Sequence, residues 1–426
     1  MSAIFLLILA AVFSLVFSGG IPPAQATTLN EALAEAYQKN PDIEAARAEL
    51  KSTEELYIQS LAGFKPSVTA LADYTSDRDS DAKVLALEMT QPVFSGGRTL
   101  ASLDESDNRI KAGRARVRLA EQQVLLDGVR AYMAVLRDQE IVDLRLNNET
   151  VLENQLQASR ARFKLGDITK TDVSQAESRL ARATADRISA QATLERGGAF
   201  FEKVIGLPPE NLQKPAATAA LPATDGAALD LAEKNNPALV LARHTEDVAR
   251  ALTRGIEGER LPAIGLTGSL GKTYNPVGAA RDEETRSVGI RATLPLYTGG
   301  ATVSRIRQSR QIENQLRMIT QSTARSVHQS VIDAKARLAA AEAESKARQA
   351  QINAAKLALD GVRVESDVGS RTMLDLLDAQ QEYLDAKVAY VGAETDRIIA
   401  AYALLAAVGS LTPERLSLVF PEKKKE

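Results

Sequence analysis

The sequence predicts a mainly α-helical chain that carries a smaller membrane β-barrel portion and is built as an internal tandem duplication. Three observations lead to this fold class. The two halves of the 426-residue chain repeat the same landmarks in the same order. No proline lies between Pro92 and Pro208, in a stretch rich in Ala, Leu, Gln, Glu and Arg that is typical of long helices. Four short segments alternate between apolar and polar residues, as strands with one apolar face do.

The duplication is visible in paired motifs at nearly constant spacing. Asn40-Pro41 recurs as Asn236-Pro237, 196 residues later. Residues 91–97 return as residues 294–300, 203 residues later, and this shift then holds through the rest of both repeats. Loops tolerate insertions but a continuous helix register does not, so the fixed spacing predicts pairs of long packed helices.

The first 26 residues are expected to be a secretory signal peptide. Residues 4–16 form an apolar run too short for a stable membrane anchor, and Ala24-Gln25-Ala26 supplies small residues for cleavage. No Lys or Arg precedes the apolar run, so a buried N-terminal helix is the alternative. Beyond this segment no run of about 18 apolar residues occurs, so an integral membrane protein of this sequence would have to use strands.

Composition narrows the possible partners and cofactors. The formal net charge of −3 gives no support to nucleic-acid binding. The chain contains no cysteine, which excludes disulfides and thiolate metal sites. Its only histidines, His244 and His328, fall in separate helical repeats outside any metal-ligand or nucleophile motif and are expected to be solvated. We therefore expect no cofactor, no metal site and no enzymatic activity.

The first repeat is expected to cover residues 27–206. Residues 28–61 are helical in pattern and are interrupted at Asn40-Pro41, because a residue before proline avoids the α region. Strands are expected at 67–76 and 83–94, and long helices at 98–163 and 167–205. The longer of these helices would reach about 100 Å.

The second repeat, residues 229–410, is expected to have the same order of elements. A Pro- and Ala-rich linker at 207–228 joins the repeats, and residues 411–426 form a tail with a basic end, Lys423-Lys424-Lys425. The expected elements are a helical stretch at about 228–256 interrupted at Asn236-Pro237, strands at 262–274 and 286–297, and long helices at 301–365 and 370–408. Repeated apolar positions along the long helices predict coiled-coil packing.

The four expected strands have the length and alternation of tilted membrane strands. Ile264 and Leu266 share one face, whereas Thr267 and Ser269 share the other. Roughly 9 to 11 residues are enough for a tilted strand to cross a hydrocarbon layer. Aromatic residues at or beside the strand ends suit an interfacial girdle, with ordinary strand-end packing as the alternative. These residues are Phe64, Tyr74, Phe94, Tyr274 and Tyr297.

Four strands cannot close a barrel by themselves. An open sheet edge in lipid leaves unpaired backbone groups, at several kcal/mol each. Several chains must therefore share one barrel. Two copies give eight strands, whose interior is filled by side chains, whereas three copies give twelve strands and leave room for a lumen. With the long helices around the same axis, the expected assembly is a tube attached to a pore.

The chain resembles the TolC-like outer membrane efflux protein family. The resemblance is carried by Gln91-Pro92-Val93-Phe94-Ser95-Gly96-Gly97, its copy ending Leu296-Tyr297-Thr298-Gly299-Gly300, the two Asn-Pro turns and residues 368–379. It implies a homotrimer with a twelve-stranded barrel in the outer membrane of a Gram-negative bacterium and an α-helical barrel across the periplasm. It also implies an exit duct that docks, through a periplasmic adaptor, to an inner-membrane transporter of the ABC or RND type.

The resemblance further implies a gate at the periplasmic end, which helix pairs close and adaptor docking opens. Asp375 and Asp378 lie on one helix face, so a trimer would project six carboxylates into the mouth. Thr372 and Asp375 also have the form of a capping box, so a helix cap is the alternative for Asp375. The hairpin tips expected to contact the adaptor are Leu165, Gly166, Asp167, Val368, Gly369 and Ser370.

A latch around the closed aperture is implied by three further matches. Arg371, Thr171 and Asp172 match family positions that link neighbouring helices, and a charge-assisted bond from the guanidinium to a carboxylate would hold the closure. A local surface ion pair worth under about 1 kcal/mol is the alternative. Where the best-known family member has a tyrosine, this chain has Ser366, which predicts a weaker or differently built latch.

A periplasmic adaptor or another soluble coiled-coil scaffold is the alternative function, because such proteins also use long helical hairpins. That class would not need two strand pairs with apolar faces. The exported substrate stays open, since multidrug efflux and type I protein secretion share the same kind of duct.

Overall fold

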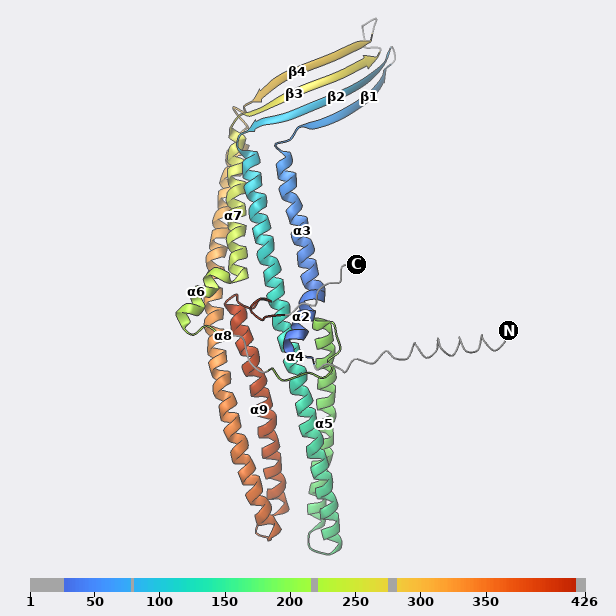
Figure 1. The fold of residues 1–426 in the computed structure, drawn as a ribbon, viewed down its shortest axis with the longest axis vertical. Helices are drawn as coiled ribbons and strands as arrows, with labels where there is room; N and C mark the ends of the chain where they lie inside the picture. Colours follow the sequence, from blue (N-terminus) through green and yellow to red (C-terminus); the bar gives the residue numbers. More distant parts are fainter. Residues whose placement is uncertain (1–26, 78–79, 216–220, 275–281, 419–426) are drawn as a thin grey trace, which may run out of the picture.

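The computed structural model describes residues 27–77, 80–215, 221–274 and 282–418. The expected signal peptide and the basic end of the tail lie outside the described residues. Figure 1 shows an elongated molecule with the sheet at one end and the long helical hairpins at the other. The sheet has four strands, and the hairpins are two, at residues 98–205 and at residues 301–407. Among the described residues, no helix is both long enough and apolar enough to cross a membrane.

Both repeats contain their elements in the expected order. The first repeat consists of α2 (Leu29–Lys39), α3 (Pro41–Ala62), β1 (Ser67–Asp77), β2 (Ser80–Ser95), α4 (Arg98–Lys164) and α5 (Lys170–Ile205). The second consists of α6 (Asp225–Asn235), α7 (Pro237–Glu257), the 3-10 helix η1 (Gly258–Arg260), β3 (Ala263–Tyr274), β4 (Glu283–Thr293), α8 (Ala301–Asp367) and α9 (Met373–Ala407). The first four residues of α6, 225–228, therefore lie inside the stretch 207–228 that is expected to be linker.

The two Asn-Pro pairs each end one short helix and begin the next. Asn40 and Asn236 have extended backbones, and each side-chain oxygen caps the following helix. The side-chain amide of Asn40 also donates to the carbonyl of Val204 at 2.9 Å, and that of Asn236 donates to the carbonyl of Ala407 at 2.9 Å. The same contact thus ties a short helix pair to the end of a long hairpin in both repeats.

The sheet is antiparallel throughout, with the strand order β1-β2-β3-β4. The two repeats meet where β2 pairs with β3, and β1 and β4 form the two edges. The expected fourth strand, 286–297, is wrong at both ends, since β4 begins at Glu283 and ends at Thr293. Among the described residues its one partner strand is β3, whose first paired residue, Ala263, lies opposite Thr293, so the residues after Thr293 have no strand there to pair with.

The main core lies midway along the molecule, where α2, α4, α5 and α9 meet (Figure 1). Tyr132 is fully buried there, and its hydroxyl donates to the carbonyl of Gln213 at 2.6 Å. The first residues of the expected C-terminal tail, 411–426, contribute to this core, because Leu411, Leu416 and Leu418 are buried in it. A second core packs α6, α7 and α9 against α8.

Candidate functional site

Two helix-to-helix turns form the end of the molecule opposite the sheet (Figure 1). Gly166 has a φ of +82° and Gly369 a φ of +78°, the left-handed region that favours glycine. The N–H of the next residue donates to a carbonyl five residues back, at 3.0 Å from Asp167 and 2.8 Å from Ser370. This is the Schellman arrangement, which satisfies the last carbonyls of a helix and reverses the chain.

A capping box begins the helix after each turn. Thr169 and Asp172 cap α5, and Thr372 and Asp375 cap α9. The carboxylate of Asp375 accepts hydrogen bonds from the Thr372 hydroxyl at 2.7 Å and from its N–H at 3.0 Å. These two bonds hold the pKa of Asp375 below its ordinary value. The helix-cap interpretation of Asp375 is therefore confirmed.

Asp378 lies almost one turn further along α9 and has a different partner. Its Oδ1 accepts a hydrogen bond from Nη2 of Arg179 on α5 at 2.5 Å. The Arg179 side chain is 27% exposed and that of Asp378 is 57% exposed. This ion pair joins the hairpin of α4 and α5 to the hairpin of α8 and α9. Within one chain, the two expected aperture carboxylates thus serve different contacts.

Arg371 bonds within its own hairpin. Its Nε donates to Oε2 of Glu365 at 2.9 Å, and this contact raises the pKa of Arg371 above its ordinary value. Among the described residues, neither Thr171 nor Asp172 forms a hydrogen bond or ion pair with it. Ser366 contributes its backbone carbonyl to the turn. Inside one chain, Arg371 therefore forms a local surface ion pair, and the expected link between hairpins is made by Arg179 instead.

A narrow seam joins the two hairpins near their tips. Within the part of the chain that the structure describes, its buried centre has three members, from α4, α5 and α9: Leu152, Ala183 and Leu377. Leu180 and Met373 are partly buried against them. Arg145 of α4 lies further from the tips, with Nη1 3.5 Å from Asp186 and 4.0 Å from Asp385. The core midway along the molecule buries far more side chains. Few apolar contacts therefore hold the hairpins together, and ion pairs flank those contacts.

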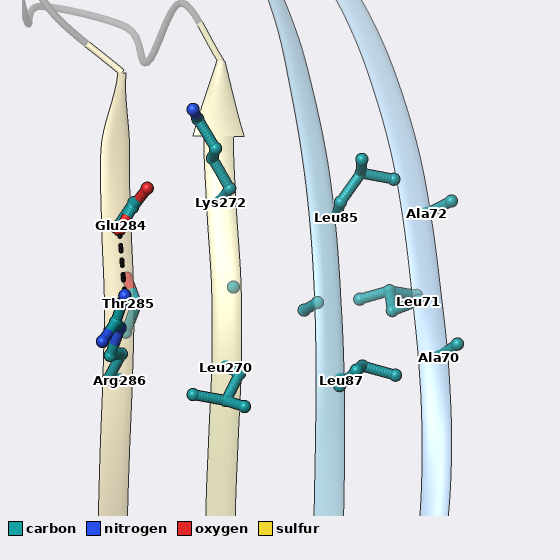
Figure 2. A pocket seen from close by; sticks show the side chains of 12 residues that line it. Ala70, Leu71, Ala72, Leu85, Leu87, Leu270, Lys272, Glu284, Thr285 and Arg286 are labelled. Carbon is teal, nitrogen blue, oxygen red and sulfur yellow. Dashed lines mark hydrogen bonds and ion pairs between the residues drawn. The ribbon is translucent and has the colours of Figure 1, made fainter.

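The sheet at the other end has one apolar and one polar face, because residues paired across antiparallel strands share a face. Figure 2 shows Leu85, Leu87 and Leu270 from the apolar face, close to Lys272 and Arg286. The register places on this face Val68, Ala70, Leu85, Leu87, Met89, Leu266, Leu270, Val288 and Ile290. The opposite face carries Thr69, Asp73, Glu88, Thr90, Thr267, Ser269, Ser287 and Arg291.

The remaining candidates for metal or acid-base chemistry are clusters of possible metal ligands and the two histidines. Within residues 27–77, 80–215, 221–274 and 282–418, no group of three His, Asp or Glu could hold a metal ion. His328 is exposed, as expected for a solvated residue. The same expectation is wrong for His244, which is partly buried on α7, where burial lowers its pKa.

Arg179 is the site residue that the sequence patterns missed, although the duplication contains a signal for it. At the shift of 203 residues, Arg179 matches Glu382 and Asp378 matches Gln175. Arg179 is basic where the second repeat has the acidic Glu382. Asp378 is acidic where the first repeat has the amide Gln175. The structure shows that these two charges, each present in only one repeat, meet each other between the repeats.

Comparison with known proteins gives concordant similarities. The family model described as "Outer membrane efflux protein" matches residues 32–197 and 228–410. The outer membrane efflux protein BepC of Brucella suis is 32% identical over 97% of this chain and 92% of its own length. The alkaline protease secretion protein AprF of Pseudomonas aeruginosa is 27% identical over 82% of this chain and 74% of its own length.

A solved structure gives the same result for the fold. The crystal structure of a membrane protein from Pseudomonas aeruginosa matches with a TM-score of 0.81 over 89% of this chain and 90% of that one, at 19% identity. The expected fold class, long helices with a smaller portion of membrane strands, is confirmed.

Proposed function

The chain belongs to the outer membrane efflux protein family, and from this membership we propose that three copies of it form one continuous duct. It is an outer membrane export channel, and the alternative of a soluble adaptor is set aside by the family match. In the proposed homotrimer, the strands form a twelve-stranded barrel in the outer membrane and the helices form a tube through the periplasm.

The open sheet is the observation that supports the trimer. Strands β1 and β4 each leave one edge unpaired, and the apolar face carries exposed side chains such as Val288 at 84% and Ile290 at 78%. In hydrocarbon every unpaired backbone group costs several kcal/mol, so the edges must be paired with other copies. Three copies supply twelve strands and leave a lumen, whereas two copies would leave only a filled barrel.

The hairpin tips are the surface that we assign to a periplasmic adaptor. Leu165 is 78% exposed and Val368 is 73% exposed, each directly before the glycine that reverses the chain. Apolar side chains exposed at the end of a long tube suit a protein partner. The adaptor would connect the duct to an inner-membrane transporter of the ABC or RND type, which supplies the energy for export.

The closed aperture belongs to the same end of the proposed trimer. Three copies of Asp375 give a ring of carboxylates, which attracts cations. The ion pair of Arg179 with Asp378 holds the two hairpins of each copy together and lowers the negative charge of the ring. Arg371 does not bond to Thr171 or Asp172 within the chain, so a link among these residues is assigned to neighbouring copies.

Efflux is the cargo class that we place first. The relative named for efflux is more similar to this chain, and over more of its length, than the relative named for protease secretion. Type I protein secretion is the second candidate, because the secretion relative still matches 82% of the chain.

The proposed assembly is tested by purifying the chain from outer membranes. We expect a species that migrates as a trimer before heating and as a monomer after heating, and that forms small cation-selective channels in planar bilayers. A chain that fractionates with soluble periplasmic proteins and migrates as a monomer without heating would refute the assembly.

A further inference from the structure

We infer that β4 of one copy pairs with β1 of the next copy in a register that places Arg291 opposite Asp73, so that a salt bridge joins the two copies on the polar face of the sheet. This inference rests on the proposed assembly and deepens it by naming the contact between copies. The evidence is the register of the strands within one chain.

The duplication extends to the strand register itself. In the first hairpin Ser67 lies opposite Thr90, and in the second Ala263 lies opposite Thr293. The shifts are 263 − 67 = 196 and 293 − 90 = 203, the same shifts that relate the repeated motifs in the sequence. The two hairpins are therefore equivalent residue by residue.

The pairing of β2 with β3 shows how one hairpin joins the next. In a closed ring of copies, β4 meets β1 of the neighbouring copy. Because the two hairpins are equivalent residue by residue, this joint is expected to repeat the one between β2 and β3. Within the chain, Glu88 lies opposite Ser269. Adding 203 to the first residue and subtracting 196 from the second places Arg291 opposite Asp73.

The chemistry of the two residues supports this register. Both lie on the polar face of their strands, and their charges are opposite. Among the described residues Arg291 has no ion pair or hydrogen-bonding partner, and Asp73 accepts only a bond of 3.3 Å from the Thr75 hydroxyl. The same register sets Tyr74 beside Ile290 on the apolar face, an aromatic and β-branched pair that stabilises sheets.

The inferred joint also explains why β4 ends early. Residues 294–297 correspond to residues 91–94 of β2, which pair with β3 residues from 264 to 266. In the assembly, the equivalent partners of 294–297 are residues 68–70 of the next copy. The strand expected to run to Tyr297 would thus reach its full length only in the closed barrel.

The absence of cysteine makes a cross-linking test direct. The test variant carries Asp73→Cys and Arg291→Cys, and the matched control carries Asp73→Cys and Gly289→Cys, which is two residues out of register on the same face. Paired residues bring their Cα atoms within disulfide range. After oxidation in outer membranes, we expect boiled samples of the test variant to contain covalent dimers and trimers, which a reductant removes, and the control to form about tenfold less.

Each outcome separates the register from the assembly. Faster cross-linking of the control would assign another register and overturn the inference. A trimer that cross-links at neither pair would overturn the pairing of β4 with β1. An unmodified chain that stays monomeric would refute the proposed assembly on which the register depends. As a second measurement, Asp73→Arg and Arg291→Asp should each lower the temperature at which the trimer dissociates, and the two together should restore it.

Discussion

Replacing Arg179 by glutamine is expected to favour the open state of the aperture. The guanidinium lies 2.5 Å from Asp378 and forms the one ion pair between α5 and α9 within the described residues. Glutamine keeps a polar side chain of similar reach but removes the positive charge. The substitution therefore loosens the seam between the hairpins without changing its buried apolar centre.

The expected magnitude follows from the exposure of the pair. Because the side chains are 27% and 57% exposed, solvent screens their attraction, and such pairs contribute about 0.2–1 kcal/mol. At about 0.5 kcal/mol for each pair, the three pairs of a symmetric trimer would together stabilise the closed state by about 1.5 kcal/mol. Losing them corresponds to roughly a tenfold shift in the ratio of closed to open channels. The closed state persists, since the apolar centre of the seam remains.

Single-channel recording in planar bilayers measures this shift. We expect Arg179→Gln and Asp378→Asn to raise the open probability alike, because each removes the same pair. The difference from the unmodified channel should shrink at about 1 M salt, where screening acts over about 3 Å. The control is Arg160→Gln, which removes an ion pair with Glu177 inside one hairpin and should leave gating unchanged.

Block by a divalent cation on the helical side separates the two carboxylates. Asp375→Asn should weaken the block, whereas Arg179→Gln should strengthen it, because that substitution leaves the Asp378 carboxylate without its balancing charge. An Arg179→Gln trimer that inserts and gates like the unmodified channel would show that the ion pair of Arg179 with Asp378 does not hold the aperture closed. If Asp378→Asn weakened the block without raising the open probability, Asp378 would be a pore residue instead.

Three further predictions test other parts of the structure. Gly96→Ala should lower the free energy of unfolding by about 2–5 kcal/mol, and Gly97→Ala by about 1–2 kcal/mol, as measured by chemical unfolding. Both glycines have a positive φ, but only a Cβ added at Gly96 would meet the carbonyl of Gly258, at 2.3 Å. Equal costs for the two substitutions would contradict this close approach. The lowered pKa of Asp375 means that its cap stabilises α9 above the pKa of an unfolded Asp and is lost as the pH falls through the lowered value. The protection of the first turn of α9 against hydrogen exchange, taken relative to intrinsic exchange at the same pH, should therefore fall on acidification in the unmodified chain and not in Asp375→Asn. Tyr132→Phe should cost about 0.5–1.5 kcal/mol at neutral pH, since it removes the hydrogen bond from the hydroxyl to the Gln213 carbonyl. Because burial raises the pKa of Tyr132 to about 12, an effect that changed between pH 6 and 9 would contradict this origin.

The long helices could be predicted from the sequence because their evidence is local and repeated. A constant shift over a full repeat permits no insertion, and the expected ends of α4 and α8 fall within two residues of the observed ones. Strand ends were harder to predict, because pairing determines them. Ser80 begins β2 through its pairing with Asp77, in a stretch whose polar residues favour a turn.

In the candidate site, too, local contacts could be predicted from the sequence and distant contacts could not. The cap of Asp375 involves a residue three positions away, and its motif is readable in the sequence. The partner of Asp378 lies 199 residues away on another helix, where no local pattern points to it. Leu411 and Leu416 lie in the expected tail but are buried, because the assembled helices supply the surface that covers them and no local pattern indicates it.

The position of the main core has a mechanical consequence. It fixes α4 between Leu125 and Val135, and beyond Val135 the helix runs on to Lys164 for about 44 Å, with only the narrow seam beside it on the side of the other hairpin. Such a rod is a lever with its fulcrum at the core: a tilt of about 10° moves the tip by about 8 Å and the seam at Leu152 by about half as much. A modest force applied at the tip therefore acts on the seam, which lies nearer the fulcrum, with a mechanical advantage.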